Sequence, residues 1–332
     1  MKAAVIGYGA WGTALAIHLH NQGNQVTLWG RDPQKIQEMH RTRENSRLAG
    51  ISLPEGLSLT SEEGIVKECD LVVFAVPSAN LRQISRQFAP FLSPDALVVS
   101  VTKGLEAETH LTMSQIISQE TGRDVVVLTG PSHAEEVSRN LPTGLLAASA
   151  DQAKAEAVQD IFLSPTLRVY TSPDPIGAEL GGALKNVIAL CAGICDGLGY
   201  GDNSKAMLMT RGLTEIARLG QALGARTETF AGLAGVGDLI VTCTSMHSRN
   251  RRAGILIGQG KTARQALEEV GAVVEGYYAA SSAFRLSRSR GVSMPIIEAT
   301  YRVLYEDADV ALSVQNLLRR QRKAESEDVG WL

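Results

Sequence analysis

The chain has 332 residues, of which 44% are hydrophobic and 20% charged, and its formal net charge at pH 7 is −3. This length favours two domains with sizeable cores, and the small net charge argues against a nucleic-acid-binding or membrane-surface protein. The four cysteines follow no CxxC spacing and the six histidines are scattered, which predicts reduced thiols, a cytoplasmic protein and no metal site.

The first thirty residues predict a dinucleotide-binding turn. A short apolar strand over 3–6 leads into GYGAWG (7–12), which opens a helix ending near residue 23, and a second strand covers 25–29. Gly7 permits the tight turn, Gly9 lets the backbone approach a pyrophosphate, and Gly12 lets helix and strand pack closely. Exposed amides at a helix start favour an anion, so NADH or NADPH is the expected ligand. Because the strand follows Met1 directly, no signal peptide is expected.

The end of the second strand bears on the choice between NAD and NADP. A site that takes only NAD usually has an acid there for the ribose 2′-hydroxyl, whereas this chain has Gly30 and Arg31. Arg31 can bind a 2′-phosphate, and Asp32 is expected to cap the helix that opens at Pro33. The sequence therefore favours acceptance of NADP without excluding NAD.

Strands and helices continue to alternate to about residue 171. Further buried strands are expected over 71–75, 97–101, 125–128, 145–150 and 167–171. This alternation predicts an α/β fold with an N-terminal Rossmann-type, doubly wound parallel sheet. Ligands bind outside the carboxyl ends of such strands, where the sequence places 76–78, Lys103 and 130–132. For Lys103, a ligand contact and an ordinary surface position are equally good interpretations.

The segment SPDP (172–175) interrupts the alternation and is expected to separate two domains. The prediction is a dinucleotide-binding Rossmann domain over 1–174 and an all-α substrate and catalytic domain over 175–332. Helices are expected over 177–197, 204–223, 235–243, 251–258, 263–270, 276–288, 295–305 and 309–321. No apolar run approaches membrane-spanning length, so no span is expected.

The first of these helices carries a single lysine on a face of small residues. One face is apolar by its three- and four-residue spacing, while Lys185 shares the other with Gly181, Gly182, Ala189, Ala192 and Gly193. A desolvated lysine has a lowered pKa, which suits proton transfer. The structural alternative is a helix–helix contact in which Lys185 extends to water.

Two clusters later in the chain also offer polar chemistry. A glycine-rich segment, GLAGVGD, ends in Asp238, which would either cap a helix or orient a lysine or a substrate hydroxyl. The segment SMHSRNRR (245–252) is either a solvated basic face or a phosphate site, since Ser248, Arg249 and Asn250 offer a hydroxyl, a guanidinium and an amide.

Ten motifs spread over nearly the whole chain carry a family resemblance. They are GYGAWGTALA (7–16), AVPS (75–78), TKGLE (102–106), GPSHAEEV (130–137), ELGGALKNVIAL (179–190), GDNSKA (201–206), TRGLTE (210–215), GLAGVGDLIVTCTS (232–245), SRNRRAG (248–254) and VVEGYYAA (273–280). Together they resemble the bacterial type of NAD(P)-dependent glycerol-3-phosphate dehydrogenase. The resemblance implies reduction of dihydroxyacetone phosphate to sn-glycerol 3-phosphate, a precursor of phospholipids, with NADH or NADPH as cofactor.

The resemblance also implies roles for individual residues. Lys185 matches the catalytic lysine, Lys103 a lysine that contacts both cofactor and substrate, and Asp238 a substrate position from which it would orient Lys185 or a substrate hydroxyl. The other implied substrate contacts are Gly130, Ser132, Ser248, Arg249 and Asn250. The implied cofactor contacts, besides the three turn glycines, are Ala10, Trp11, Arg31, Ala134, Val273, Glu275 and again Arg249. Where relatives often have an aromatic residue before Leu-Pro-Gly, this chain has RLAG (47–50), and Arg47 is expected to stack on the adenine or meet a 2′-phosphate.

Three alternatives remain open on sequence alone. A β-hydroxyacid dehydrogenase of the 6-phosphogluconate type shares the two-domain plan and the helix lysine, although the SRN and GDL segments argue against it. A dinucleotide-sensing protein would bind cofactor without turnover. The helical domain could also serve chiefly as a subunit interface, and a homodimer is compatible with enzyme activity. The expected partner is a small-molecule substrate rather than a nucleic acid.

Overall fold

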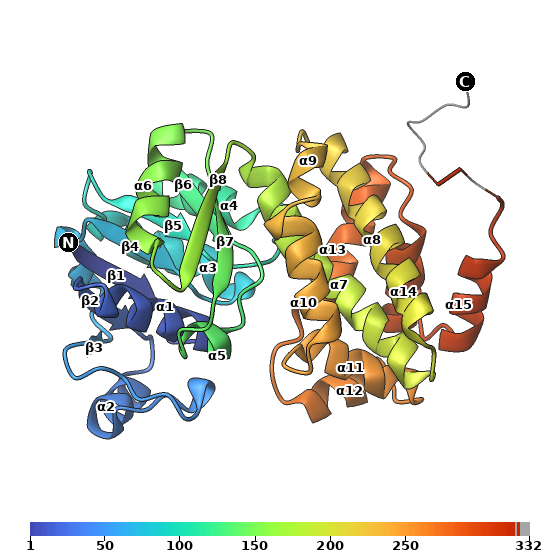
Figure 1. The fold of residues 1–332 in the computed structure, drawn as a ribbon, viewed down its shortest axis with the longest axis horizontal. Coiled ribbons are helices and arrows are strands. Elements are labelled where there is room, and N and C mark those ends of the chain that lie inside the picture. The colour runs from blue at the N-terminus through green and yellow to red at the C-terminus, as the bar shows by residue number, and fades with distance from the viewer. Residues whose placement is uncertain (323, 326–332) are drawn as a thin grey trace.

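The computed structural model describes residues 1–322, 324 and 325, which form two halves lying side by side (Figure 1). The N-terminal half contains a sheet with helices packed on it, and the C-terminal half contains only helices within the described residues. The predicted class, a Rossmann-type sheet followed by an all-α region, is confirmed.

The sheet has eight strands in the order β3-β2-β1-β4-β5-β6-β7-β8. The strands are β1 (Lys2–Ile6), β2 (Gln25–Trp29), β3 (Ser58–Thr60), β4 (Leu71–Phe74), β5 (Leu97–Ser100), β6 (Val125–Thr129), β7 (Thr143–Ala148) and β8 (Leu167–Ser172). All were expected except β3. This edge strand has three residues, too few to show a period in the sequence.

One pairing departs from the predicted parallel sheet. Neighbouring strands run parallel except β6 and β7, which pair antiparallel with Val127 opposite Ala148. The only helix between them, α5 (Ala134–Val137), has four residues and rises about 6 Å. That is too short to return the chain along the sheet, as a parallel crossover requires.

Helices cover both faces of the sheet because its strands are apolar on both sides. On one face, α1 (Ala10–Asn21) and α6 (Gln152–Phe162) share a core with β1, β2 and β8. On the other, α3 (Ser78–Phe88) and α4 (Met113–Thr121) pack over β4 and β5. The remaining helix of this half, α2 (Pro33–Thr42), follows β2.

The C-terminal half is built around α7 (Pro175–Gly197), in which every residue from Gly177 to Cys195 is buried. The surrounding elements are α8 (Asp202–Ala222), α9 (Thr227–Phe230), a π-helical turn (Leu233–Gly237), α10 (Asp238–Thr244), α11 (Arg249–Gly258), α12 (Ala263–Val270), α13 (Glu275–Ser289), α14 (Pro295–Tyr305) and α15 (Val310–Leu318). A helix enclosed in this way is mostly apolar, and its buried polar side chains, Glu179, Lys185 and Asn186, are hydrogen-bonded.

The small residues of α7 allow close helix contacts. A Cβ at Gly193 would lie 2.0 Å from the carbonyl oxygen of Arg251, and one at Gly181 would lie 2.4 Å from that of Ala234. By length and composition α7 could cross a membrane, contrary to the expectation from sequence, but 94% of its most apolar window is buried inside the molecule.

Asp174, between the last strand and α7, is bonded to the helical half. Its Oδ1 accepts from the backbone N of Gly177 at 2.9 Å, which caps α7, and its Oδ2 accepts from Arg226 N at 2.8 Å and from the Thr229 hydroxyl at 2.6 Å. The sheet ends at Ser172 and α7 begins at Pro175. The division into domains at residues 174 and 175 stays a prediction.

Candidate active site

The ammonium group of Lys185 is buried beneath α10. Its side chain is 8% exposed, and Nζ donates to Oδ1 of Asp238 and, at 2.8 Å, to the hydroxyl of Thr242. Asp238 is the first residue of α10, and Thr242 lies one turn later, with its hydroxyl donating to the carbonyl oxygen of Asp238 at 2.6 Å. The alternative in which Lys185 extends to water is therefore wrong.

The carboxylate of Asp238 joins Lys185 to Lys103. Nζ of Lys103, on the loop after β5, donates to Oδ2 of Asp238 at 2.6 Å and to the carbonyl oxygen of Gly130 at 3.0 Å. The same carbonyl accepts from the Ser132 hydroxyl at 2.9 Å. Asp238 is 1% exposed and does not cap α10. Five of the residues singled out from the sequence thus meet between the two halves.

Burial and the neighbouring charges act on Lys185 in opposite directions. Desolvation lowers its pKa; Asp238 raises it, and Lys103 lowers it further, so the pKa falls from 10.5 to about 8. Burial alone would raise the pKa of Asp238, but the two ammonium groups outweigh it and hold that pKa below its usual value. Lys185 can therefore exchange a proton near neutral pH beside a carboxylate that stays ionised.

The turn after β1 fits a dinucleotide. Gly7 has φ +120°, and a Cβ at Gly12 would lie 2.1 Å from the carbonyl oxygen of Gly7, so only glycine suits either position. A Cβ at Gly9 would meet nothing within 4 Å, and Gly9 provides no side-chain cap for α1. Open space therefore lies before the first turn of α1, which begins with Ala10 and Trp11. A pyrophosphate bound at this helix start would need such space.

The tip of β2 carries two arginines and a tyrosine. Asp32 caps α2 as predicted, since its Oδ1 accepts from the backbone N of Gln34 at 3.0 Å and that of Lys35 at 3.2 Å. Arg31 is exposed. The Tyr8 ring packs over the strand end, and the guanidinium carbon of Arg47 lies 5.4 Å from the centre of that ring. This tip thus offers positive charge and an aromatic face, with its one acid occupied in a helix cap.

A second contact between the halves lies beside the Lys103 loop. Ser78, the first residue of α3, donates to Oε2 of Glu275, the first residue of α13, at 3.1 Å. Burial raises the pKa of Glu275, partly opposed by the Ser78 bond and by the charge of Arg249. Two other expected cofactor contacts differ in exposure, since Val273 is exposed and Ala134 is buried at the start of α5.

The three expected phosphate contacts differ in what they bind within the protein. The hydroxyl of Ser248 caps α11 by accepting from Arg251 N at 3.2 Å. The amide of Asn250 donates to Asn186 Oδ1 at 2.9 Å and accepts from Gly276 N at 2.8 Å. Both side chains are buried, whereas Arg249 is exposed. A phosphate role for these residues stays a prediction.

Two residues of this site were not singled out from the sequence. Thr242 lies four positions after Asp238, so helical spacing could have placed it on the same face. His133 lies between two expected contacts, with Nε2 buried and without a hydrogen-bond partner among the described residues. Burial, and to a lesser extent Lys185, lowers its pKa, and its ring centre is 5.6 Å from that of His247. No pattern in the sequence points to this pair.

Comparisons with known proteins agree over both halves. The family model for the N-terminus of NAD-dependent glycerol-3-phosphate dehydrogenase matches residues 2–155, and the model for the C-terminus of the same family matches residues 174–315.

Individual relatives cover nearly the whole chain. A protein of Moorella thermoacetica named glycerol-3-phosphate dehydrogenase (NAD(P)+) is 51% identical over 330 residues, which are 99% of this chain and 98% of the relative. One of the same name from Desulfitobacterium hafniense is 50% identical over 333 residues, covering 100% and 95%. The 2.1 Å crystal structure of glycerol-3-phosphate dehydrogenase from Coxiella burnetii superposes with a TM-score of 0.92 at 35% identity, covering 96% of this chain and 99% of that one. Because the fold matches and the two family models cover successive parts of the sequence, the chain belongs to the NAD-dependent glycerol-3-phosphate dehydrogenase family.

Proposed function

We propose that this protein catalyses the reversible reduction of dihydroxyacetone phosphate to sn-glycerol 3-phosphate with NADPH or NADH. The names of the relatives support the reaction and the cofactor pair. The observation that carries the mechanism is the buried cluster in which Asp238 holds both Lys185 and Lys103.

Lys185 acts as the general acid in this direction. A bound nicotinamide cofactor supplies the hydride for the ketone carbon. Lys185, protonated below pH about 8, stabilises the negative charge that develops on the carbonyl oxygen and donates a proton to it. In the reverse reaction the neutral amine accepts the proton of the alcohol. Asp238 and Thr242 hold Nζ in place throughout.

The other residues position the substrate. Lys103 adds a second positive charge beside Lys185 and, through Gly130, is tied to the loop that carries Ser132. Arg249, at the start of α11, is proposed to bind the substrate phosphate together with Ser248 and Asn250. Binding energy from a remote phosphate can hold the reacting carbon in place for hydride transfer.

The turn of Gly7, Gly9 and Gly12 would hold the cofactor pyrophosphate, with Ala10 and Trp11 following it. Arg31 and Arg47 are proposed to take a 2′-phosphate at the tip of β2. Glu275 and Val273 would approach the cofactor from the C-terminal half, and Ala134 from the loop after β6.

An oxidation assay tests the proposal directly. NADPH and NADH are offered with dihydroxyacetone phosphate, with other phosphorylated ketones, and in reverse with NADP and 6-phosphogluconate. The expected result is turnover with dihydroxyacetone phosphate well above the rest. Turnover only with 6-phosphogluconate, or cofactor binding without turnover of any substrate, would contradict the proposal.

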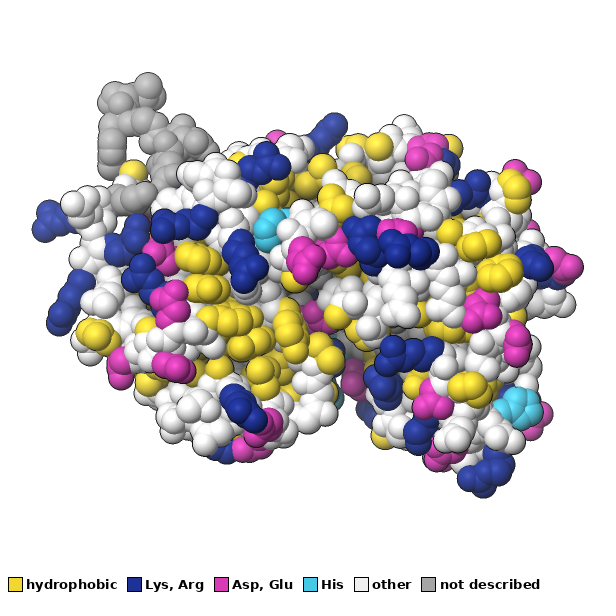
Figure 2. Space-filling view, turned by 180° about the vertical axis from the view of Figure 1, so that it is seen from behind, with side chains coloured by type: hydrophobic (Ala, Val, Ile, Leu, Met, Phe, Trp, Pro, Cys, Tyr) yellow, Lys and Arg dark blue, Asp and Glu magenta, His cyan; other side chains and the backbone are white. Residues whose placement is uncertain are grey.

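We further infer that the enzyme is cytoplasmic and supplies a phospholipid precursor. We also infer that it forms a homodimer. All four cysteines are free and buried, as expected in a reducing compartment. Hydrophobic side chains gather on the face of the C-terminal half that Figure 2 shows. In the same half, side chains of α8, α14 and α15 line a cavity of about 600 Å³. Light scattering tests the dimer, and a mass of one chain would exclude it.

A further inference from the structure

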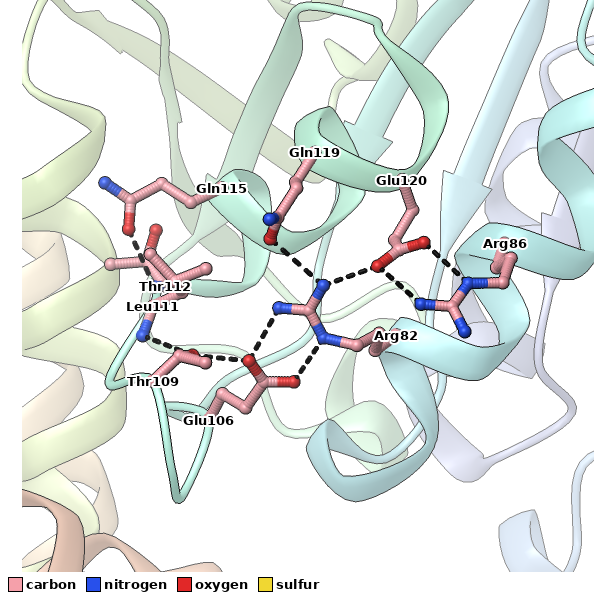
Figure 3. A network of polar contacts seen from close by, with 9 residues as sticks. All are labelled: Arg82, Arg86, Glu106, Thr109, Leu111, Thr112, Gln115, Gln119 and Glu120. Atoms are coloured by element: carbon pink, nitrogen blue, oxygen red, sulfur yellow. Dashed lines mark hydrogen bonds and ion pairs between the residues drawn. The ribbon is translucent and has the colours of Figure 1, made fainter.

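Behind the Lys103 loop, a network of ion pairs joins that loop to α3 and α4 (Figure 3). Arg82 on α3 donates to Glu106 through two parallel bonds, Nε to Oε1 and Nη2 to Oε2, each 2.7 Å long. Its Nη1 also donates to Glu120 on α4 at 2.5 Å, and Arg86 donates to that carboxylate at 2.8 Å. Paired parallel bonds of this kind fix orientation as well as distance. Arg82 and Glu106 are 26% and 21% exposed, so solvent screens them only in part.

Glu106 is rigidly held within its own loop. Its backbone N donates to Leu111 O at 3.0 Å, and its carbonyl oxygen accepts from His110 N at 3.0 Å. The hydroxyl of Thr109 donates to its carboxylate. The loop therefore closes on Glu106, and Arg82 attaches the closed loop to α3.

Lys103 lies three residues before this anchor. On its other side the hydroxyl of Thr102 donates to Val76 O at 2.9 Å, so Lys103 is held between two attached points. Gly104, between them, has φ +150°, and a Cβ there would lie 2.8 Å from that of Ser78. The chain from Lys103 to Glu106 is three residues long and can span at most about 11 Å. Because this connection is short, a shift of Glu106 is expected to move Lys103 as well.

We propose that Arg82 and Glu106 are positioning residues for Lys103, whose ammonium group they keep in contact with Asp238 by anchoring the loop to α3. The inference rests on the proposed function, in which Lys103 and Lys185 form one site. A purely structural ion pair would contribute to folding stability and leave the chemistry of Lys185 unchanged.

The two possibilities differ in the titration of Lys185. The titratable groups that face it are Asp238 on α10, Lys103 on the anchored loop, His133 after β6 and the thiol of Cys243. Withdrawal of Lys103 removes a positive charge and leaves Asp238 to Lys185 alone, and both changes raise the pKa of Lys185. The bond from Arg82 keeps the pKa of Glu106 below its usual value, so the anchoring pair itself stays ionised in the assay range.

The experiment compares Glu106→Gln and Arg82→Lys with the wild type. Arg86→Gln is the matched control, because it removes the far arm of the same network and leaves the Arg82–Glu106 bonds in place. NMR of protein carrying 13C-labelled lysine follows Lys185 through a pH titration, with its signal identified by its absence from Lys185→Arg. Both test variants should raise the pKa of Lys185 by about one unit, and the control should leave it unchanged. A lowered melting temperature with no shift in pKa would overturn the proposal.

A double-mutant cycle gives the second measurement. In a Lys103→Met background, Glu106→Gln should change kcat less than about twofold, because the residue through which it acts is gone. The same loss of kcat in both backgrounds would show that Glu106 acts independently of Lys103. The NMR titration needs no substrate. A wild type that fails to reduce dihydroxyacetone phosphate would therefore refute the proposed function while the titration still decides the positioning role.

Discussion

The pKa of Lys185 is determined by burial, by the carboxylate of Asp238 and by the ammonium group of Lys103. Desolvation exceeds the stabilisation that Asp238 provides, which leaves the lysine protonated at neutral pH but able to lose its proton without strong base. An exposed lysine would not do this, since water would stabilise its charge.

Replacement of Lys185 by methionine should abolish most of the catalysis and leave the fold intact. Methionine fills a similar volume, and Asp238 keeps its bond to Lys103. We expect kcat to fall by about 10²- to 10⁴-fold, the usual range for a lost proton donor. Lys154→Met, which removes a partly exposed lysine bound to Asp124, serves as the control. A kcat within a few-fold of the wild type would exclude Lys185 as the acid.

The two reaction directions should depend oppositely on pH. Reduction needs protonated Lys185, so its kcat should fall as pH rises through about 8. Oxidation needs the neutral amine, so its kcat should rise over the same range. Steady-state profiles measured in both directions with saturating substrates would show this. Parallel profiles in the two directions would mean that another group titrates.

Arg31 should determine how well NADPH is accepted. The acid nearest the tip of β2, Asp32, is engaged as the cap of α2, so Arg31 is available for a 2′-phosphate. Arg31→Ala should raise the KM for NADPH about tenfold or more, which corresponds to one charge-assisted hydrogen bond. The KM for NADH should barely change. Equal losses for both cofactors would instead indicate a structural residue.

At the scale of elements, α7 and α4 are joined through one buried carboxylate. Glu179 accepts from the backbone N of Ser114 at 2.7 Å and from its hydroxyl at 2.6 Å, at the N-terminal end of α4. Burial raises the pKa of Glu179, and the bonds from Ser114 oppose that rise. This contact connects the helix that carries Lys185 to the sheet half.

Removal of this carboxylate should destabilise the protein. Glu179→Ala leaves the partly buried backbone N of Ser114 without this partner, which costs about 1–3 kcal/mol of unfolding free energy. Glu179→Gln should cost less, because its amide oxygen can still accept one bond. Urea denaturation of both variants, with the exposed Glu156→Ala as a control, measures the difference. Equal losses for the alanine and glutamine variants would contradict this account of the contact.

At the scale of the molecule, the candidate site is assembled from both halves. The sheet half contributes Lys103 and the loop of Gly130, and the helical half contributes Lys185, Asp238 and Arg249. A substrate bound between them would be held at its phosphate by one half and meet charges from both at its carbonyl.

Arg249→Ala should therefore discriminate between substrates by their phosphate. Loss of a charge pair that becomes buried on binding costs about 2 kcal/mol or more, or roughly 30-fold in kcat/KM for dihydroxyacetone phosphate. Unphosphorylated dihydroxyacetone, itself a poorer substrate, should be affected far less. Arg252→Ala, on the same helix, is the matched control. Equal losses for the two substrates would show that Arg249 does not contact the phosphate.

Local sequence patterns were enough to predict most elements and to indicate the family. Glycine turns, apolar strands and helical periods are local patterns, so the Rossmann turn, the cap at Asp32 and nearly all the helices could be predicted. The ten motifs identified the family because they lie along nearly the whole chain. The edge strand β3 was missed because three half-exposed residues carry no periodic signal.

The assembly of the site depends on how distant segments pack together. Asp238 lies 53 positions from Lys185 and 135 from Lys103, and no local pattern states that its two oxygens bind both. The burial of α7 from Gly177 to Cys195, the antiparallel pairing of β7 and the contact of Thr242 with Lys185 likewise depend on which elements pack together. Packing removes Lys185 from water, and that desolvation, which the sequence cannot specify locally, makes this lysine suited to proton transfer.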